Sequence, residues 1–184
     1  MTRIATLYQA FFVRIEMTLA PYLPTFARLI FAGVLLQYFW YSARTKLGEG
    51  WLGFLSPSNG AYIQIFPKAA EAVGYDSTQL SILHSVVVIA GTWAEFALPL
   101  LIGLGVLTRL AALGMAGFIV VQSFVDVTGH GVGGDDLGTW FDAAPGALIF
   151  DQRALWLLLL AILVLRGSGP LAFDRFVRIR RREA

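Results

Sequence analysis

Four stretches of the chain are apolar enough to cross a lipid bilayer. They run from about Phe26 to Tyr41, Leu80 to Leu104, Leu110 to Val127 and Ala154 to Leu165. A spanning helix needs roughly 20 mainly apolar residues, and the first and last stretches are shorter. We therefore expect charged residues at their ends, such as Arg28 and Lys46, to snorkel toward the headgroups. The pattern predicts an all-α membrane protein, a bundle of four transmembrane helices.

The first 25 residues carry an amphipathic pattern instead. Apolar side chains recur at helical spacing, at Ile4, Leu7, Tyr8, Phe11, Phe12, Ile15 and Leu19. Such a stripe is typical of a helix that lies along a membrane interface, although a helix partly buried under the bundle would show it as well. Pro21 and Pro24 are expected to end this helix, and no cleavable signal is evident.

These patterns divide the chain into three parts. Residues 1–25 are expected to form the interfacial helix, 26–176 the four-helix membrane domain, and 177–184 a basic cytoplasmic tail. Four spans place both termini on one side, together with ten of the 14 lysines and arginines. The excess of positive charge predicts that both termini lie in the cytoplasm, in the inner membrane of a bacterium.

Composition agrees with a membrane location and excludes several classes of chemistry. Hydrophobic residues make up 57% of the chain and charged residues only 14%, against about 45–50% and about 25% in soluble domains. The absence of cysteine excludes disulfides, thiolate metal sites and thiol catalysis. The basic tail follows an apolar span, which predicts contact with lipid headgroups and not with nucleic acid.

The glycine-rich segment after the third span contains the only candidate metal ligands. Carboxylate and imidazole groups that suit a divalent cation occur at Asp126, His130, Asp135 and Asp136. Their spacing matches no metal-binding motif, and the neighbouring glycines favour a flexible loop. We predict no metal site.

Glu95 is the most informative single residue. It is the only charged side chain between Ser77 and Leu107. A carboxylate inside a span costs a few kcal/mol, so it usually faces a partner or a cavity and often marks function. Arg28 is the expected partner and Arg109 the second choice, because a guanidinium can hold a carboxylate through two hydrogen bonds. A purely structural ion pair would explain the charges equally well.

Three further residues are candidates for contact with a ligand. His84 precedes Glu95 by three helical turns on the same face, about 16 Å along the axis, so the two could lie at opposite ends of a proton or quinone path. Each could instead satisfy a separate interhelical hydrogen bond. Trp93 lies deep enough to pack against a flat ligand. Lys46 either attracts an anionic headgroup or partner, or simply snorkels from the end of its span.

Several short motifs occur in an order that resembles a known family. They are Arg28-Leu29, Lys46-Leu47, Glu95 followed by Leu98 and the stretch from Leu100 to Leu107, Thr108-Arg109-Leu110-Ala111-Ala112, and Arg166-Gly167-Ser168-Gly169-Pro170 ending in Phe173-Asp174. Together they resemble the DoxX family of small four-helix membrane proteins, over roughly residues 26–176. The chain departs from that family in two places. Ser42 and Ala43 stand where a glycine is frequent, and Ser168-Gly169-Pro170 replaces Gly-Pro-Gly.

The resemblance implies an integral membrane subunit of a quinone-linked redox complex. Family members are associated with quinol oxidase and thiosulfate:quinone oxidoreductase assemblies, and others with oxidative-stress complexes. Arg28, Lys46, Glu95, Arg109 and Asp174 carry over as the shared framework. No covalently bound cofactor is expected, so the electron carrier would belong to a partner subunit.

Within this interpretation, Glu95 and Arg28 form the catalytic pair. Glu95 takes or relays a proton from a bound quinol, and the cavity around the quinone contains His84, Trp93, Lys46 and Arg109. The alternative is a non-catalytic membrane scaffold that recruits a soluble redox or stress-response enzyme. A small-solute or metal-ion transporter is less favoured, because only Gly91 and Pro99 could interrupt a helix within the bundle.

Overall fold

The protein is described here by a computed structural model that covers residues 2–175; the tail predicted at 177–184 lies outside these residues. Every regular element within that range is helical. The elements are α1 (Thr2–Leu19), η1 (Ala20–Tyr22), α2 (Leu23–Thr45), α3 (Asn59–Ile65), α4 (Pro67–Ala72), η2 (Ser77–Gln79), α5 (Ile82–Leu104), α6 (Thr108–Thr128), α7 (Gly134–Leu137), η3 (Leu148–Gln152) and α8 (Arg153–Arg166).

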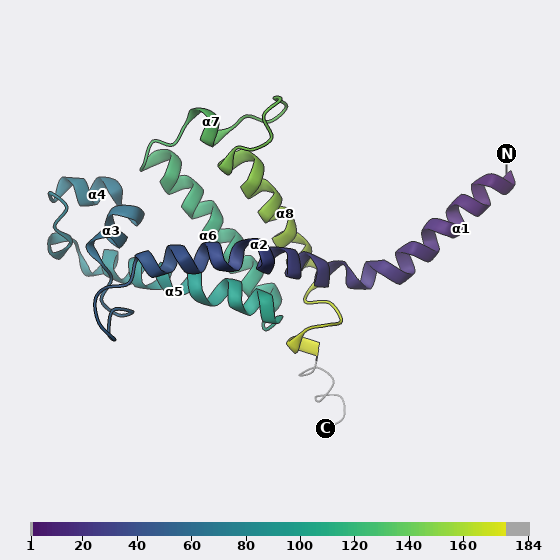
Figure 1. Cartoon of the computed structure of the whole chain (residues 1–184), viewed down its shortest axis with the longest axis horizontal. Helices are drawn as coiled ribbons and strands as arrows, with labels where there is room; N and C mark the ends of the chain where they lie inside the picture. Colours follow the sequence, from purple (N-terminus) through teal and green to yellow (C-terminus); the bar gives the residue numbers. More distant parts are fainter. Residues whose placement is uncertain (1, 176–184) are drawn as a thin grey trace, which may run out of the picture.

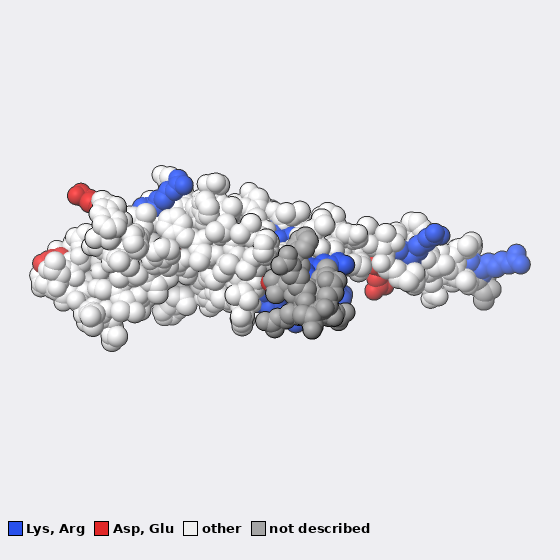
Figure 2. Space-filling view, turned by 90° about the horizontal axis from the view of Figure 1, so that it is seen from below, with Lys and Arg blue, Asp and Glu red and all other residues white. Residues whose placement is uncertain are grey.

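Four helical stretches of the described chain are long and apolar enough to cross a membrane. They are Arg3–Thr45, Ile82–Leu104, Thr108–Thr128 and Leu148–Arg166. The prediction of an all-α protein with four candidate membrane spans is thereby confirmed, by length and composition. Figure 2 shows the same property on the surface: charged side chains gather toward the left end and along α1, whereas the face over the bundle between them is largely uncharged.

The N-terminal helix differs from its prediction. Pro21 and Pro24 do not end it; α1, η1 and α2 follow one another without a break, and Arg3–Thr45 is itself a span candidate. Each proline stands within the first two positions of a helical segment, where its missing N–H and fixed φ do no harm. From Arg3 to Leu19, α1 is exposed and projects away from the bundle (Figure 1). The alternative of a helix partly buried under the bundle is therefore wrong.

Helices α2, α5, α6 and α8 pack around one apolar core. α2 packs against α5 and α8, and α6 packs against α5 and α8, so the four form a closed bundle. The fully buried side chains at its centre are Phe31, Leu35, Phe39, Ile102, Met115, Ile119, Leu160 and Leu163. The long helices run alternately up and down. We call the end where α2 begins and α8 ends the terminal end, and the opposite end the loop end.

A network of polar contacts holds the terminal end together. Asp174, beyond α8, accepts hydrogen bonds from the backbone N–H groups of Leu107 and Thr108 at 2.8 and 3.0 Å. Its carboxylate thus satisfies donors at the start of α6 that the helix itself leaves free. The Asp174 N–H in turn donates to the Gly105 carbonyl at 2.9 Å. The chain beyond α8 is fastened to the turn between α5 and α6.

Gly105 is the tightest point of this network. Its φ of +72° ends α5, and a Cβ there would lie 2.5 Å from a guanidinium nitrogen of Arg28 and 2.6 Å from the Ala172 Cβ. We expect Gly105→Ala to lower the free energy of unfolding by more than the roughly 1–2 kcal/mol that a left-handed conformation alone costs.

Gly74→Ala is the matched control. Gly74 also has a positive φ, +61°, but an added Cβ would meet nothing within 4 Å. Thermal unfolding in mild detergent should therefore rank Gly105→Ala clearly below Gly74→Ala. Equal losses in the two variants would show that the close packing at the terminal end contributes nothing.

Candidate functional site: a buried ion pair beside a cavity

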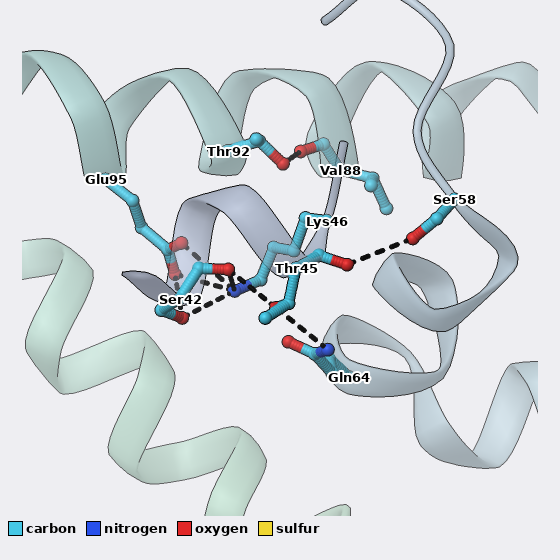
Figure 3. A network of polar contacts seen from close by, with 8 residues as sticks. All are labelled: Ser42, Thr45, Lys46, Ser58, Gln64, Val88, Thr92 and Glu95. Carbon is cyan, nitrogen blue, oxygen red and sulfur yellow. Dashed lines mark hydrogen bonds and ion pairs between the residues drawn. The ribbon is translucent and has the colours of Figure 1, made fainter. Parts of the chain in front are cut away.

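Glu95 forms an ion pair with Lys46 in the interior of the bundle. The Lys46 Nζ lies 3.0 Å from each carboxylate oxygen, and the two side chains are only 5% and 4% exposed. Figure 3 shows the two groups facing each other between α2 and α5. The expectation that Glu95 is buried against a cation is confirmed.

The end of α2 positions the lysine. Lys46 directly follows α2, and its Nζ also donates to the Ser42 carbonyl at 3.2 Å and to the Ser42 Oγ at 2.7 Å. An ammonium group there is favoured, because the carbonyls of a helix's last turn lack partners and carry partial negative charge. The Ser42 hydroxyl donates in turn to the Glu95 Oε1 at 3.3 Å. The three residues therefore form a closed ring of hydrogen bonds (Figure 3).

Pro99 and Trp40 affect two neighbouring backbone carbonyls of α5, those of Glu95 and Phe96. Pro99 lies inside α5 and has no N–H, so the Glu95 backbone carbonyl, four residues earlier, loses its usual helical donor. The Trp40 Nε1 donates to the next carbonyl, that of Phe96, at 3.0 Å. This hydrogen bond links α2 to α5 one residue after Glu95 and helps to fix the relative position of the two helices.

The ion pair borders a cavity of about 500 Å³ between α5 and α6. Small residues of both helices make room for it: Ala90, Gly91 and Ala94 on α5, and Gly114 and Gly117 on α6. Val87 and Val121, which also line it, are exposed, so the cavity opens sideways on the apolar face of the bundle. Its size and mostly apolar wall are typical of sites for small molecules.

A second polar group lies where the cavity meets the loop end. Asp126 lines the cavity and forms an ion pair with Arg153 at the start of α8. The Asp126 Oδ2 lies 2.6 Å from a guanidinium nitrogen of Arg153. Arg153 is 2% exposed and also donates to the Ser123 Oγ at 2.9 Å. His130 lines the cavity as well, with its Nε2 2.9 Å from the Gln64 carbonyl. Charged groups therefore lie at both ends of a mostly apolar cavity.

The predicted pairing of Glu95 with Arg28 is wrong. Arg28 is buried at the terminal end, where its guanidinium donates to the Gly103 carbonyl at 3.0 Å and to the Leu171 carbonyl. Gly103 lies on α5 more than two helical turns from Glu95. Arg28 therefore belongs to the network around Asp174 and Gly105, and not to the cavity.

Arg109, the second choice, contacts the end of α8 and not Glu95. It is exposed, and its guanidinium donates to the Leu165 carbonyl at 3.2 Å, in the last turn of α8. That carbonyl is one of those a helix end leaves free, so Arg109 acts as a cap. Like Arg28, it fastens elements at the terminal end.

His84 and Trp93 are not brought into the cavity. The His84 Nδ1 lies 2.8 Å from the Ser81 Oγ at the start of α5, and the ring packs edge-on against Phe66. Trp93 follows Gly91 by two positions, which places it on nearly the opposite side of α5 from the cavity. Its Nε1 donates to the Phe54 carbonyl at 3.2 Å. The His84 contact with Ser81 is local to the start of α5, and the Trp93 contact is with the loop after α2.

Sequence reasoning missed two members of the site. Arg153 directly precedes the fourth apolar stretch, and this position was the only signal in the sequence that it could be buried. Ser42 was noted only as a departure from a family pattern. Asp126 and His130 do line the cavity, yet no group of three or more metal-ligating side chains occurs within residues 2–175.

Comparison with known proteins adds no assignment. No family model, no curated protein and no solved structure matches this chain. What is shown is a small all-helical protein with four candidate membrane spans, a buried Lys46–Glu95 pair and a lateral cavity beside it.

Proposed function

We propose that this protein binds a quinone-type ligand in the cavity between α5 and α6, as a membrane subunit of a redox complex of the DoxX type. The observation that carries the proposal is the buried Lys46–Glu95 pair on the wall of an apolar cavity that opens sideways. A ligand that enters there would come from the bilayer. It would need an apolar body and a polar head, which is the chemistry of a membrane quinone.

In this proposal Glu95 accepts a hydrogen bond, or a proton, from the ligand head, and Lys46 stabilises the carboxylate. Lys46 thus takes the role first expected of Arg28. The redox step itself needs an electron carrier on a partner subunit. We place the protein in the bacterial inner membrane with both termini in the cytoplasm, on the distribution of its basic residues. The cavity would then lie toward the periplasmic side.

The first test is the quinone content of the purified protein. Extracted from its membrane in mild detergent, the wild-type chain should carry close to one quinone per chain, and Glu95→Gln should carry little or none. Glu71→Gln is the control, since Glu71 is an exposed carboxylate on α4. Quinone bound equally to all three proteins would remove Glu95 from the site, and none in the wild type would contradict the proposal.

A scaffold remains the second candidate, because of α1. The helix exposes its apolar stripe along its whole described length, including Ile4 at 77% and Leu7 at 72%. Such a stripe suits an interfacial helix at the membrane surface or a partner helix. A soluble enzyme that co-purifies with the wild-type chain, but not with a variant lacking residues 1–19, would favour this function.

A further inference from the structure

We propose that the cavity selects the reduced, dihydroxy form of a quinone-type ligand over the oxidised, dicarbonyl form. This inference rests on the proposed function and names the form of the ligand that the site prefers. It follows from the hydrogen-bonding character of the charged and titratable groups that face the cavity. A quinol can donate hydrogen bonds through its hydroxyl groups, whereas a quinone can only accept them.

Among the described residues, Lys46 is the one lysine or arginine that lines the cavity, and all three of its N–H donors are in use. An ammonium group has three N–H donors. In the structure they serve the Ser42 carbonyl, the Ser42 Oγ and the carboxylate of Glu95. A ligand carbonyl could be bound by Lys46 only if one of these contacts broke. The cation therefore offers little to an oxidised quinone.

The two carboxylates that line the cavity keep acceptor capacity. Within residues 2–175, the Glu95 Oε2 receives a hydrogen bond only from Lys46, and each carboxylate oxygen can accept about two. The Asp126 Oδ2 accepts a hydrogen bond from Arg153, and no donor of the described chain reaches the Asp126 Oδ1. Both carboxylates would attract a hydroxyl group of the ligand and repel a carbonyl oxygen.

His130 adds a third acceptor at the loop end. Its Nε2 lies 2.9 Å from the Gln64 carbonyl, which can only accept, so Nε2 must carry the proton. In the neutral ring the Nδ1 is then an acceptor. The amides of Gln64 and Gln122 also line the cavity, but an amide both donates and accepts and does not discriminate. The balance of the lining therefore favours a ligand that donates.

The test compares three ligands built on one ring and tail with the full-length protein in mild detergent. They are a short-tailed benzoquinone, its quinol kept reduced without oxygen, and the dimethyl ether of that quinol, which has no donor. Titration calorimetry should show the quinol binding at least about tenfold more tightly than the other two, as expected for one hydrogen bond to a charged acceptor. A quinone that binds as tightly as the quinol would overturn the selectivity but leave the proposed function standing. If none of the three binds, both fail.

A double variant tests whether the selectivity comes from the ion pair. Glu95→Gln together with Lys46→Met removes both charges, so that no unpaired ion is left buried. This double variant should bind the quinol at least about tenfold more weakly than the wild-type chain does, so that most of the preference for the quinol over the quinone is lost. Glu71→Gln, on exposed α4, should keep the full preference. A double variant that still prefers the quinol by tenfold would show that the preference does not come from Glu95.

Discussion

Replacing Lys46 with methionine is expected to lower the free energy of unfolding by about 3–5 kcal/mol, which is the usual cost of leaving one member of a buried ion pair without its partner. The Glu95 side chain is only 4% exposed, so water cannot compensate for the lost ammonium group. The Ser42 carbonyl and hydroxyl would lose their donor in the same step. The effect is measured by thermal unfolding, or by titration with a denaturing detergent, in a mild-detergent background.

Two further variants separate the pair from a general loss of charge. Lys68→Met removes an exposed lysine from α4 and should change stability by less than about 0.5 kcal/mol. Lys46→Met combined with Glu95→Gln should recover most of the stability lost in the single variant, because no buried charge is left alone. A double variant less stable than Lys46→Met would contradict this account of the pair.

The same double variant separates structure from function. If the pair only fixes the relative position of α2 and α5, the double variant should fold and keep its quinone and its partners. If Glu95 handles the ligand head, the double variant should fold and lose the quinone. Stability and ligand content are then read on one protein, so misfolding cannot imitate a lost site.

Arg153→Leu is expected to have the second largest effect, about 3 kcal/mol, toward the lower end of the range for breaking a buried pair. Arg153 is 2% exposed at its side chain, whereas Asp126 is 25% exposed and keeps some contact with solvent. The substitution leaves the Asp126 carboxylate and the Ser123 hydroxyl on α6 without their donor from α8. The loop end of the α6–α8 contact should loosen, and unfolding in mild detergent measures the loss.

Arg166→Leu serves as the control on the same helix. Arg166 is exposed in the last turn of α8, where a cation contributes typically 0.3–1 kcal/mol through the helix dipole. Arg153→Lys keeps the positive charge but not the paired N–H donors of a guanidinium group. Its loss of stability should lie between those of Arg153→Leu and Arg166→Leu. If Arg153→Leu costs no more than Arg166→Leu, the buried pair at the loop end adds nothing to stability.

The two buried pairs show where reasoning from sequence succeeds and where it stops. That Glu95 needs a buried cation follows from its position in an apolar span. Which cation meets it depends on the relative height of two helices. If α2 and α5 began and ended at the same levels along the bundle axis, Arg28 would lie nearest to Glu95. In the structure Ala32 packs beside Gly103, so Arg28 lies about one helical turn farther toward the terminal end, and its guanidinium extends to the Gly103 carbonyl. The end of α2 reaches only the middle of α5.

The reason lies in how the loop end is built. α3 packs against the first turns of α5, where Tyr62 donates to Ser85 and Ala61 packs with Val88. It covers part of the stretch of α5 that α2 does not reach. Short helices without a strong periodic pattern give little indication of such a role in the sequence, so the offset between α2 and α5 could not be read from it.

By itself, the sequence determined the helical class, the four candidate spans and the presence of a buried carboxylate, because apolar runs and their period are local properties of the chain. Only the tertiary structure decided that Lys46 is the partner of Glu95, that Arg28 and Arg109 fasten the terminal end, that neither His84 nor Trp93 lines the cavity, and that Arg153 is buried. These outcomes depend on helix register and rotation. Packing between residues far apart in the chain sets both.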